Sequence, residues 1–390
     1  MLRKVSLYEI IVFLMIWVYY SLNARYLNMP GFTLLRWLFP IMLILLVVLG
    51  KRGKIAFPPN LLILFVIATV PSILLSADKS TSVLRFVSFV LILYGSYLFF
   101  CSLSNEKLLR RYFESLVFVL VIYQILNITF VLLGIGVDNG RSTGITTNAN
   151  TMGIYANLAF WAILYLMGQT KKLIYKGVWL ALLISAGAAV LASGSRTAFV
   201  VLVLNIMIVL MLFFRKSIFI FPCIIVIIIG VFLLFNGELT FLQITALDRL
   251  LEDGGTTRDI LWNSALAVWR RHRIFGCGYT VSPLYNVIER GMTFHNSYLS
   301  FLVECGLWGS CVLGVGIIVY LVRVIIHLIH RKNTRIHDVF FVSCLMVFNL
   351  LIAAWSESFL FAVGSTEGFT FWFLIAWLAA YMKLDCWERK

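Results

Sequence analysis

The sequence predicts an all-α, polytopic membrane protein. Of its 390 residues, 62% are hydrophobic and only 13% are charged, which is about half the charged fraction of an ordinary soluble domain. Apolar runs of about 17–25 residues recur along the chain, and each is long enough to cross the hydrocarbon core of a bilayer as a helix. Together these observations exclude an ordinary soluble domain.

Hydropathy predicts about 12 transmembrane helices, divided by one long polar interval. Residues 1–235 would hold the first nine helices, 236–296 would form a long external loop that contains amphipathic helices and a catalytic segment, and 297–390 would hold the last three. The predicted spans are 6–22, 31–50, 58–76, 83–102, 112–135, 149–168, 175–193, 197–214, 217–235, 297–322, 338–355 and 368–382.

The placement of the basic residues predicts the orientation in the membrane. A formal net charge of +15 would be compatible with nucleic-acid binding, but 20 of the 32 Lys and Arg residues fall on the side that holds the N-terminus. Because positive charge is retained in the cytoplasm, we expect both termini to be cytoplasmic and the loop at 236–296 to face the periplasm or exterior. The predicted partners are therefore membrane lipids, with no nucleic acid.

The seven cysteines are scattered and lie mostly within predicted spans. No Cys-x-x-Cys motif or Cys/His cluster has the spacing of metal ligands, so we expect neither a metal site, nor a cofactor, nor a disulfide framework. Cys277 and Cys305 flank the outer face and could pair, although two buried free thiols are the favoured interpretation.

The polar interval at 236–298 is where we expect the chemistry. It contains a predicted helix at 256–273, in which Trp262 lies on the same face as Arg258. We expect this helix to lie along the membrane surface with its tryptophans at the interface. His295 follows at the start of the tenth predicted span, at the edge of the polar interval.

A cation at the start of a predicted helix indicates an anion site. Arg196 follows the turn at Gly194, between the seventh and eighth predicted spans. Free N–H groups and the helix dipole already favour an anion at this position, so the arginine is electrostatically misplaced unless an anion binds to both. Arg258 stands in the first turn of its own helix in the same way.

Five other residues leave more than one interpretation open. Arg36 and Arg85 fall inside predicted spans near their outer ends, where an arginine either snorkels to the interface or faces a polar cavity. Snorkelling is expected for Arg36, and a cavity is favoured for Arg85. Arg141 lies in the third outward connection, and Asn148 and Asn150 either cap the next helix or present amides to a sugar.

Two arginines at helix starts and one histidine, all facing outward, suit a phosphate-bearing lipid and a proton transfer. Arginine binds phosphate oxygens bidentately and stays charged, and histidine can accept a proton from a hydroxyl near neutral pH. No Asp-x-Asp pair and no Ser-His-Asp or Cys-His arrangement is legible. We therefore predict displacement of a (pyro)phosphate by a hydroxyl, with arginine neutralising the leaving group.

The motifs around these residues resemble the bacterial O-antigen ligase/polymerase family. The resemblance covers about the second half of the chain by motif and all of it by topology, including the long loop late in the sequence. One departure is Ala149, where many members carry proline between two asparagines. The motifs are Ser193-Gly194-Ser195-Arg196-Thr197, the Arg258–Trp262 helix, Gly276-x-Gly278, His295-Asn296-x-Tyr298-Leu299 and Glu304-x-Gly306-Leu307-x-Gly309.

The resemblance implies an inverting, metal-independent glycosyltransferase of the bacterial inner membrane. Its donor would be a glycan on undecaprenyl pyrophosphate, already in the outer leaflet. Carried onto this chain, the catalytic residues are Arg196 and Arg258, which would hold the pyrophosphate, and His295, which would orient or deprotonate the acceptor hydroxyl. The residues expected to bind substrate are Arg85, Arg141, Asn150, Asn296, Tyr298 and Glu304.

The acceptor decides the activity within this family. A second lipid-linked repeat unit as acceptor would make the protein a polysaccharide polymerase, with room for a chain-length regulator as a partner, whereas a sugar of the lipid A core would make it a ligase. The Ser-Gly-Ser-Arg form and the aromatic Gly-Leu-Trp-Gly ending favour the polymerase. A transporter of lipid-linked sugars is the rival from another class, but transporters usually have two similar halves, and here only the second half has a long external loop.

Overall fold

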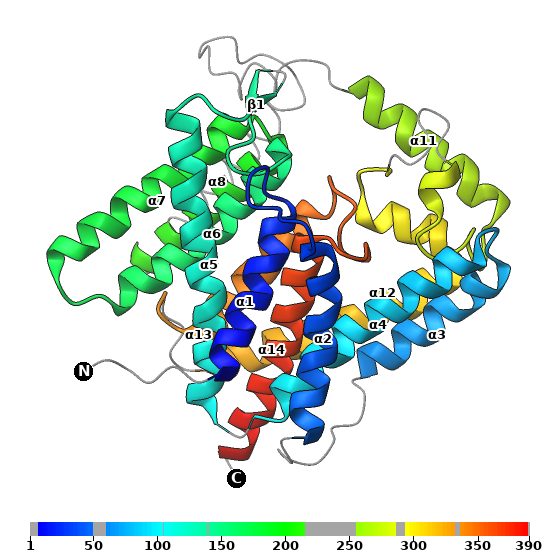
Figure 1. Cartoon of the computed structure of the whole chain (residues 1–390), viewed down its shortest axis with the longest axis horizontal. Helices are drawn as coiled ribbons and strands as arrows, with labels where there is room; N and C mark the ends of the chain where they lie inside the picture. Colours follow the sequence, from blue (N-terminus) through cyan, green and yellow to red (C-terminus); the bar gives the residue numbers. More distant parts are fainter. Residues whose placement is uncertain are drawn as a thin grey trace.

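The computed structural model describes residues 7–49, 60–103, 105–138, 140–214, 255–285, 293–331 and 336–388. This part of the chain contains twelve α-helices, one short 3-10 helix and a two-stranded antiparallel hairpin (Figure 1). The elements are α1 (Leu7–Leu22), α2 (Phe32–Leu49), α3 (Asn60–Leu75), α4 (Lys79–Cys101), α5 (Glu106–Leu132), β1 (Val137–Asp138), β2 (Arg141–Ser142), α6 (Ala149–Gln169), α7 (Leu173–Ser193), α8 (Arg196–Phe214), α11 (Gly255–Arg271), η2 (Ser282–Tyr285), α12 (Ser297–His330), α13 (Val339–Ala353) and α14 (Thr366–Glu388).

The helices confirm the predicted all-α fold. Each predicted span corresponds to one α-helix, apart from the span at 217–235, which lies outside the described residues. Several helices are longer than predicted: α5 begins at Glu106, before the span predicted from residue 112, and α12 continues to His330, past the predicted end at 322. Hydropathy ends a span at the first charged residues, but Glu, Lys and Arg are good helix formers and the helix continues through them.

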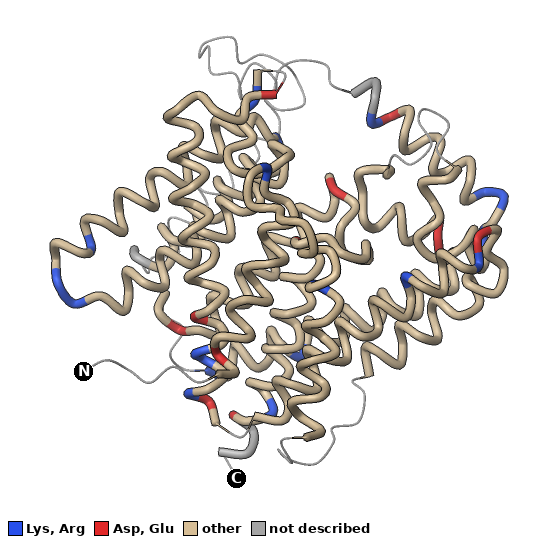
Figure 2. The backbone as a smooth tube through the Cα atoms, in the orientation of Figure 1, with Lys and Arg blue, Asp and Glu red and all other residues tan. Residues whose placement is uncertain are grey.

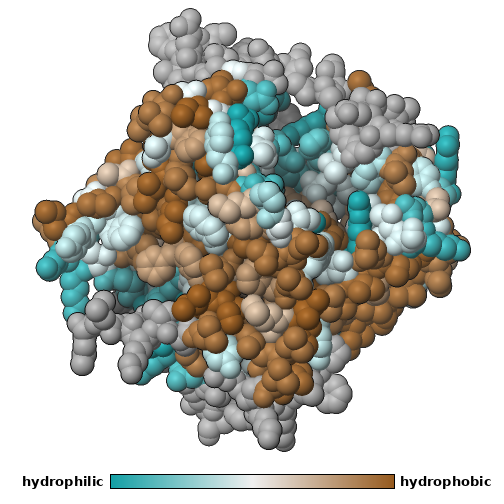
Figure 3. Space-filling view, in the orientation of Figure 1, coloured by the Kyte–Doolittle hydropathy of each residue, from teal (hydrophilic) through white to brown (hydrophobic). Residues whose placement is uncertain are grey.

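The helices have the length and surface of a membrane protein. Six of those described, α2, α4, α5, α6, α7 and α12, are long and apolar enough to cross a membrane, and four shorter apolar helices accompany them. Charged residues gather in the connections and at helix ends (Figure 2). Apolar residues cover most of the helical face in Figure 3, and hydrophilic residues surround a hollow at its upper end.

The most deeply buried of these spans is α6, which packs against α5, α7, α8 and α13. Within its most apolar stretch 78% of the residues are buried, compared with 17% in α7 and α12. Asn205 of α8 donates to Asn157 at 3.1 Å and accepts a hydrogen bond from Trp161 Nε1 at 2.9 Å. Because an unpaired amide is unfavourable in an apolar body, these bonds fix α6 against α8.

Two glycines interlock the loop after α11 with α12. Gly276 has a φ angle of +79°, and Gly306, at a kink inside α12, has a φ angle of +66°. A β-carbon on Gly276 would overlap the carbonyl of Glu304, and one on Gly306 would overlap the carbonyl of Ile274. Only glycine satisfies both the backbone conformation and the close approach, so the Gly276-x-Gly278 and Glu304-x-Gly306 motifs serve a single contact.

The kinked backbone of α12 finds its hydrogen-bond partners in that loop. The bonds measure 2.8–3.1 Å and run from the N–H groups of Cys277, Gly278, Leu307 and Trp308 to the carbonyls of Val303, Glu304, Arg273 and Ile274, respectively. Non-helical backbone inside an apolar body is tolerated only when protein groups satisfy it in this way. The loop and the first part of α12 therefore form one structural unit.

The amphipathic helix α11 packs onto this unit. Ala265 is fully buried in a cluster with Cys277, Phe294 and Val303, and Trp269 packs against the same cluster. Trp262 and Trp269 are half-buried, and their expected position at a lipid interface stays a prediction. The apolar stripe of α11 meets loop residues from later in the chain, and periodicity alone cannot distinguish a protein surface from a membrane surface.

We expect the substitution Gly306→Ala to destabilise the protein strongly. The new methyl group would overlap the Ile274 carbonyl, and the native fold would force alanine to adopt a positive φ angle. Together these two effects should lower the stability by about 2–5 kcal/mol. The melting temperature of the detergent-purified protein is measured as the temperature at which heated samples lose the folded peak in size-exclusion chromatography.

The substitution Gly314→Ala is the matched control for this prediction. Nothing lies within 4 Å of a β-carbon at this position in the same helix, and alanine is the better helix former, so the melting temperature should be unchanged or slightly higher. Equal melting temperatures for Gly306→Ala and the wild type would contradict the interlock.

Candidate functional site

A histidine and a glutamate from two loops form the centre of the candidate site. His295 lies just before α12, and its Nδ1 is 3.1 Å from Oε2 of Glu357, in the loop between α13 and α14. A carboxylate oxygen can only accept a hydrogen bond, so Nδ1 carries the proton and Nε2 is the acceptor atom of the neutral ring. The side chains are 32% and 17% exposed, so a substrate can reach both.

The backbone holds these two residues in place. His295 has a φ angle of +48°, a backbone conformation that is strained for residues other than glycine and is often found at functional sites. The two loops are joined immediately after it: the N–H of Asn296 donates to Ser358 Oγ at 2.9 Å, and Ser297 Oγ donates to the carbonyl of Glu357 at 2.6 Å. The separation of the histidine and the carboxylate is therefore set by backbone contacts.

Asn150 connects the carboxylate to an arginine. Its Nδ2 donates to Oε1 of Glu357 at 2.5 Å, and its Oδ1 accepts from Nη2 of Arg141 at 2.6 Å. The N-cap of α6 is Asn148, whose side chain accepts from the N–H of Asn150. Capping thus applies to Asn148, whereas Asn150 is directed at other side chains. We call Arg141, Asn150, Glu357 and His295 the His295 network.

The arginine end of the His295 network rests on the turn between α7 and α8. Gly194 takes the left-handed conformation at the end of α7, with a φ angle of +57°, and α8 begins at Arg196 as predicted. Arg141 Nε donates to the carbonyl of Ser193 at 2.8 Å, which satisfies a carbonyl at the end of α7. Arg196 therefore starts its helix beside the turn that Arg141 contacts.

Arg258 approaches the same region from α11. It precedes Trp262 by about one helical turn on the same face, and Trp262 Nε1 donates to the carbonyl of Phe294, the residue before the histidine, at 3.2 Å. The Trp262 ring also meets Trp355 at a centroid distance of 5.9 Å. No hydrogen bond or ion pair to another described residue holds the Arg258 guanidinium.

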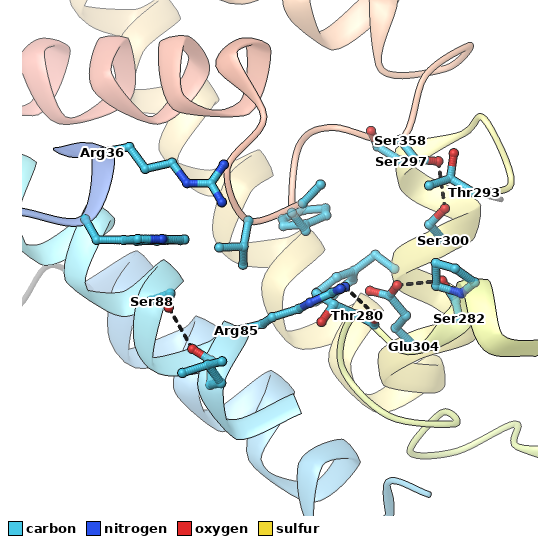
Figure 4. A pocket seen from close by; sticks show the side chains of 17 residues that line it. Arg36, Arg85, Ser88, Thr280, Ser282, Thr293, Ser297, Ser300, Glu304 and Ser358 are labelled. Carbon is cyan, nitrogen blue, oxygen red and sulfur yellow. Dashed lines mark hydrogen bonds between the residues drawn. The ribbon is translucent and has the colours of Figure 1, made fainter. Parts of the chain in front are cut away.

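A cavity of about 530 Å³ opens beside the His295 network (Figure 4). Arg36 and Arg85 both line it, so the cavity favoured for Arg85 is present and the snorkelling expected for Arg36 is not observed. Arg85 Nη1 donates to the carbonyl of Thr280 at 2.9 Å. Buried Glu304 accepts from Ser282 Oγ at 2.6 Å. The two loops of the His295 network contribute Thr293, Ser297 and Ser358 to the wall.

Two motif residues have structural partners. Asn296 caps α12: its Oδ1 accepts from the N–H groups of Tyr298 and Leu299 at 3.0 and 2.9 Å, and the residue is 3% exposed. Tyr298 donates from its hydroxyl to the carbonyl of Leu351 at 2.7 Å and leaves part of its ring exposed. Contact of Asn296 and Tyr298 with a substrate stays a prediction.

Sequence reasoning missed Glu357. It lies in the connection between the last two predicted spans, where no motif was recognised. The available signal was the position of Glu357 and Glu367 between apolar segments in a chain with only 17 acidic residues, because carboxylates close to an apolar body are functional candidates. Only the folded chain shows that this loop returns to His295.

Two groups in the connections between helices have shifted pKa values. Hydrogen bonds from Thr81 and Ser80 hold the pKa of Asp78, the N-cap of α4, below its usual range. Burial, with a smaller contribution from the Glu304 charge, raises the pKa of the Cys277 thiol to about 12. Cys277 and Cys305 are both free, which confirms the favoured interpretation of these cysteines.

The arrangement can bind an anion and accept a proton. Among the residues that the structure describes, no group of three His, Cys, Asp or Glu side chains could hold a metal ion. The positive charge around the His295 network is that of arginines, and Nε2 of His295 is the atom available to take a proton. These are the elements of a group-transfer site on a helical membrane protein.

The comparisons with known proteins point in the same direction. A family model described as O-antigen ligase matches residues 179–314, a segment that includes Arg196, Arg258 and His295. The match supports membership of the O-antigen ligase/polymerase family, the family indicated by the motifs, and therefore a membrane enzyme of this type. No curated protein and no solved structure matches the chain.

We expect Cys277 to resist labelling by a soluble maleimide in the native protein. Its side chain is buried, and a pKa of about 12 leaves almost no thiolate, the reactive form, near neutral pH. In a variant whose only cysteine is Cys277, labelling should be about a hundredfold or more slower than at an ordinary exposed cysteine.

The comparison cysteine is Asn263→Cys, at an exposed position of α11, introduced into a variant without other cysteines. The rates are measured by mass spectrometry over a time course, and labelling after denaturation confirms that Cys277 is chemically intact. Similar native rates at the two positions would contradict the packing of the Gly276–Gly278 turn on α12.

Proposed function

We propose that this protein is an inverting, metal-independent glycosyltransferase that polymerises undecaprenyl-pyrophosphate-linked repeat units into a surface polysaccharide. The observation that carries the proposal is the His295 network. A carboxylate binds one nitrogen of the histidine, and an amide joins that carboxylate to an arginine at the turn before Arg196. This geometry supports a proton acceptor beside an anion site.

The proposed reaction joins formation of a glycosidic bond to transfer of one proton. The oxygen of the acceptor hydroxyl attacks the anomeric carbon of the donor sugar from the face opposite the pyrophosphate. The bond between that carbon and the pyrophosphate oxygen breaks, and its electron pair leaves with the lipid pyrophosphate. The hydroxyl proton passes to Nε2 of His295, the nitrogen that faces away from Glu357.

Glu357 acts in this scheme as a positioning residue. Its carboxylate would keep the imidazole in the required tautomer and stabilise the imidazolium that forms, as the third member of a catalytic triad does. Asn150 holds the second carboxylate oxygen, so the group does not rotate away from the histidine. The strained backbone of His295 also fits a ring held in one orientation.

Arg196 and Arg258 would neutralise the leaving pyrophosphate. The N–H groups and dipole of α8 add to the charge of Arg196 at the helix start, and Arg258 lies on α11, which borders the other side of the site. Arg141 donates hydrogen bonds to the carbonyl of Ser193 and to Asn150. We therefore assign to it the role of linking the anion site with His295. Guanidinium groups bind phosphate oxygens bidentately and keep their charge.

The proposal places the site at the periplasmic or exterior face of the bacterial inner membrane. In Figure 1, α1 begins and α14 ends at one end of the bundle, whereas β1 and α11 lie at the opposite end. If the termini are cytoplasmic, as the basic residues predict, the end that carries α11 faces outward. A donor that has been moved to the outer leaflet would meet the site there.

An O-antigen ligase is the second candidate. The matching family model is described as O-antigen ligase, and the two activities would share the donor, the proton acceptor and the leaving group. They would differ in the acceptor, which is a second lipid-linked glycan for a polymerase and a lipid A core sugar for a ligase. The identity of the acceptor is therefore the quantity to measure.

The test uses purified protein in detergent, a synthetic undecaprenyl-pyrophosphate-linked repeat unit and EDTA, with products resolved on a gel. We expect a ladder from the wild type. The rate should fall by about 10²–10⁴-fold for His295→Ala, which removes the proton acceptor, and by about 10²–10³-fold for Arg196→Ala and Arg258→Ala, which remove leaving-group stabilisation.

The substitution Arg270→Ala is the control, because this arginine is exposed at the opposite end of α11 from Arg258 and should not affect the rate. Transfer that begins only when lipid A core is added would identify a ligase. No covalent product with either acceptor, or complete inhibition by EDTA, would contradict the proposal, and the first of these results would favour transport.

We expect Glu357→Gln to lower kcat by about 10²–10⁴-fold with little change in KM, because glutamine preserves the shape of the side chain but not its charge. Steady-state kinetics over a range of substrate concentrations measures kcat and KM separately.

The control for this variant is Glu114→Gln, which alters a carboxylate bonded to Arg110 and Tyr165 away from the site. It should leave both kcat and KM unchanged. A Glu357→Gln enzyme with wild-type kcat, or with kcat and KM altered together and a lowered melting temperature, would contradict the positioning role of the carboxylate.

A further inference from the structure

Two arginines line the cavity beside the His295 network. They differ in whether their guanidinium groups have partners among the described residues. Arg85, from α4, donates to the carbonyl of Thr280 at 2.9 Å. Its guanidinium points towards the carboxylate of Glu304 in Figure 4, and the two charges interact. Arg85 therefore has polar partners within the cavity wall, the carbonyl of Thr280 and the carboxyl group of Glu304.

Arg36, from α2, has no such partner. Its guanidinium extends towards the cavity in Figure 4 and lies over the ring of Trp37, with Cζ 4.7 Å from the ring centroid. Its Nε is buried without a hydrogen-bond partner, and no carboxylate among the described residues pairs with it. An arginine within an apolar helical body is unfavourable unless it meets an anion or a polar space, so Arg36 brings a positive charge without an acidic partner to the cavity.

The position of this guanidinium depends on a glycine in the last loop. Gly364 has a φ angle of +88°, and a β-carbon there would overlap Nη1 of Arg36. The glycine backbone and the Trp37 ring thus hold the guanidinium between two surfaces. Both contacts place the guanidinium at the wall of the cavity.

The remainder of the wall suits a sugar ring. Hydroxyl groups of Thr280, Ser300 and Ser358 line the cavity together with the aromatic ring of Phe361. Thr280 Oγ1 is itself buried without a partner among the described residues. Hydroxyls that can donate or accept match sugar hydroxyls, aromatic faces match the C–H faces of a sugar ring, and the volume lies within the range of about 300–1,000 Å³ that is usual for small-ligand sites.

We propose that this cavity is a subsite for a sugar residue that carries one negative charge, with Arg36 binding the charged group. The group is a monoanion, either the carboxylate of a uronic acid or a phosphodiester substituent, because Arg36 is the arginine of this wall that has no acidic partner among the described residues. Ser297 and Ser358 belong both to this wall and to the loops that hold His295. The inference rests on the proposed function and makes acidic glycans the preferred substrates.

The test compares three lipid-linked repeat units that are identical except at one sugar, which is glucose, glucuronic acid or glucose bearing a methyl phosphodiester. For wild-type protein we expect kcat/KM to be about 10–100-fold higher for at least one acidic unit than for the neutral unit, the range of a charge-assisted hydrogen bond. The acidic unit that shows the larger gain identifies the carboxylate or the phosphodiester as the natural group.

The variants separate charge recognition from a structural role of Arg36. Arg36→Gln should remove the preference and retain turnover of the neutral unit, and Arg36→Lys should keep part of the preference, because the charge remains but the bidentate geometry is lost. The matched control is Arg25→Gln, at an exposed position in the connection before α2, which should show the full wild-type preference.

A binding measurement provides a readout that does not depend on turnover. Isothermal titration of the full-length protein with lipid-free oligosaccharides should give tighter binding of the acidic than of the neutral compound, by about 10–100-fold. Arg36→Gln should abolish this difference. The melting temperature of each variant establishes that it is folded before binding is measured.

The outcomes distinguish this inference from the function on which it rests. Equal kcat/KM values for the three units in the wild type, or a preference that survives Arg36→Gln, would overturn the subsite and leave the glycosyltransferase proposal intact. Absence of transfer with every unit would contradict that proposal. In that case the titration decides the subsite alone: charge-selective binding that requires Arg36 supports it, and equal binding overturns it.

Discussion

Irregular backbone inside an apolar body must find its hydrogen-bond partners in the protein, and this constraint organises the region around α12. The helix begins under an Asn296 cap and kinks at Gly306, so both places expose polar backbone groups. The loop after α11 satisfies the kink, and the loop before α14 satisfies the start of the helix, where Ser297 N–H donates to the carbonyl of Ala354 at 2.8 Å. The ionisable residues His295 and Glu304 lie on this segment, where the irregular backbone already requires polar groups.

One hydroxyl illustrates how far this constraint extends. Ser297 Oγ donates to the carbonyl of Glu357 and accepts from the N–H groups of Phe359 and Leu360 at 2.9 and 3.2 Å. A single side chain therefore fixes a four-residue stretch of the last loop against the start of α12. The distance between His295 and the Glu357 carboxylate follows from this backbone arrangement together with the hydrogen bond from Asn150 that orients the carboxylate.

The elements that the sequence predicted correctly are those encoded locally. Apolar runs define the helices, Gly194 marks the turn before Arg196, and Asn148 is a typical helix cap. The relation of Glu357 to His295 joins segments about 60 residues apart through a short carboxylate contact, and no local pattern encodes such a pair. The position of the Arg36 guanidinium could not be predicted either, because it packs against Gly364 in the last loop, far along the chain.

The His295 network and the cavity that contains Arg36 are connected through Ser297 and Ser358. Both residues line the cavity, and both form hydrogen bonds that hold the loops of His295 and Glu357 together. Interactions with a part of the substrate that does not react can orient the part that does, provided that the groups that bind it are held in place beforehand. Arg36 meets this condition, since its guanidinium is already held between Trp37 and Gly364 before any ligand arrives. Little reorganisation would then be needed when a charged sugar enters the proposed subsite. A sugar held there would lie against the hydroxyls that fix the His295 loops, so charge recognition in the cavity and alignment of the acceptor hydroxyl would follow from the same packing.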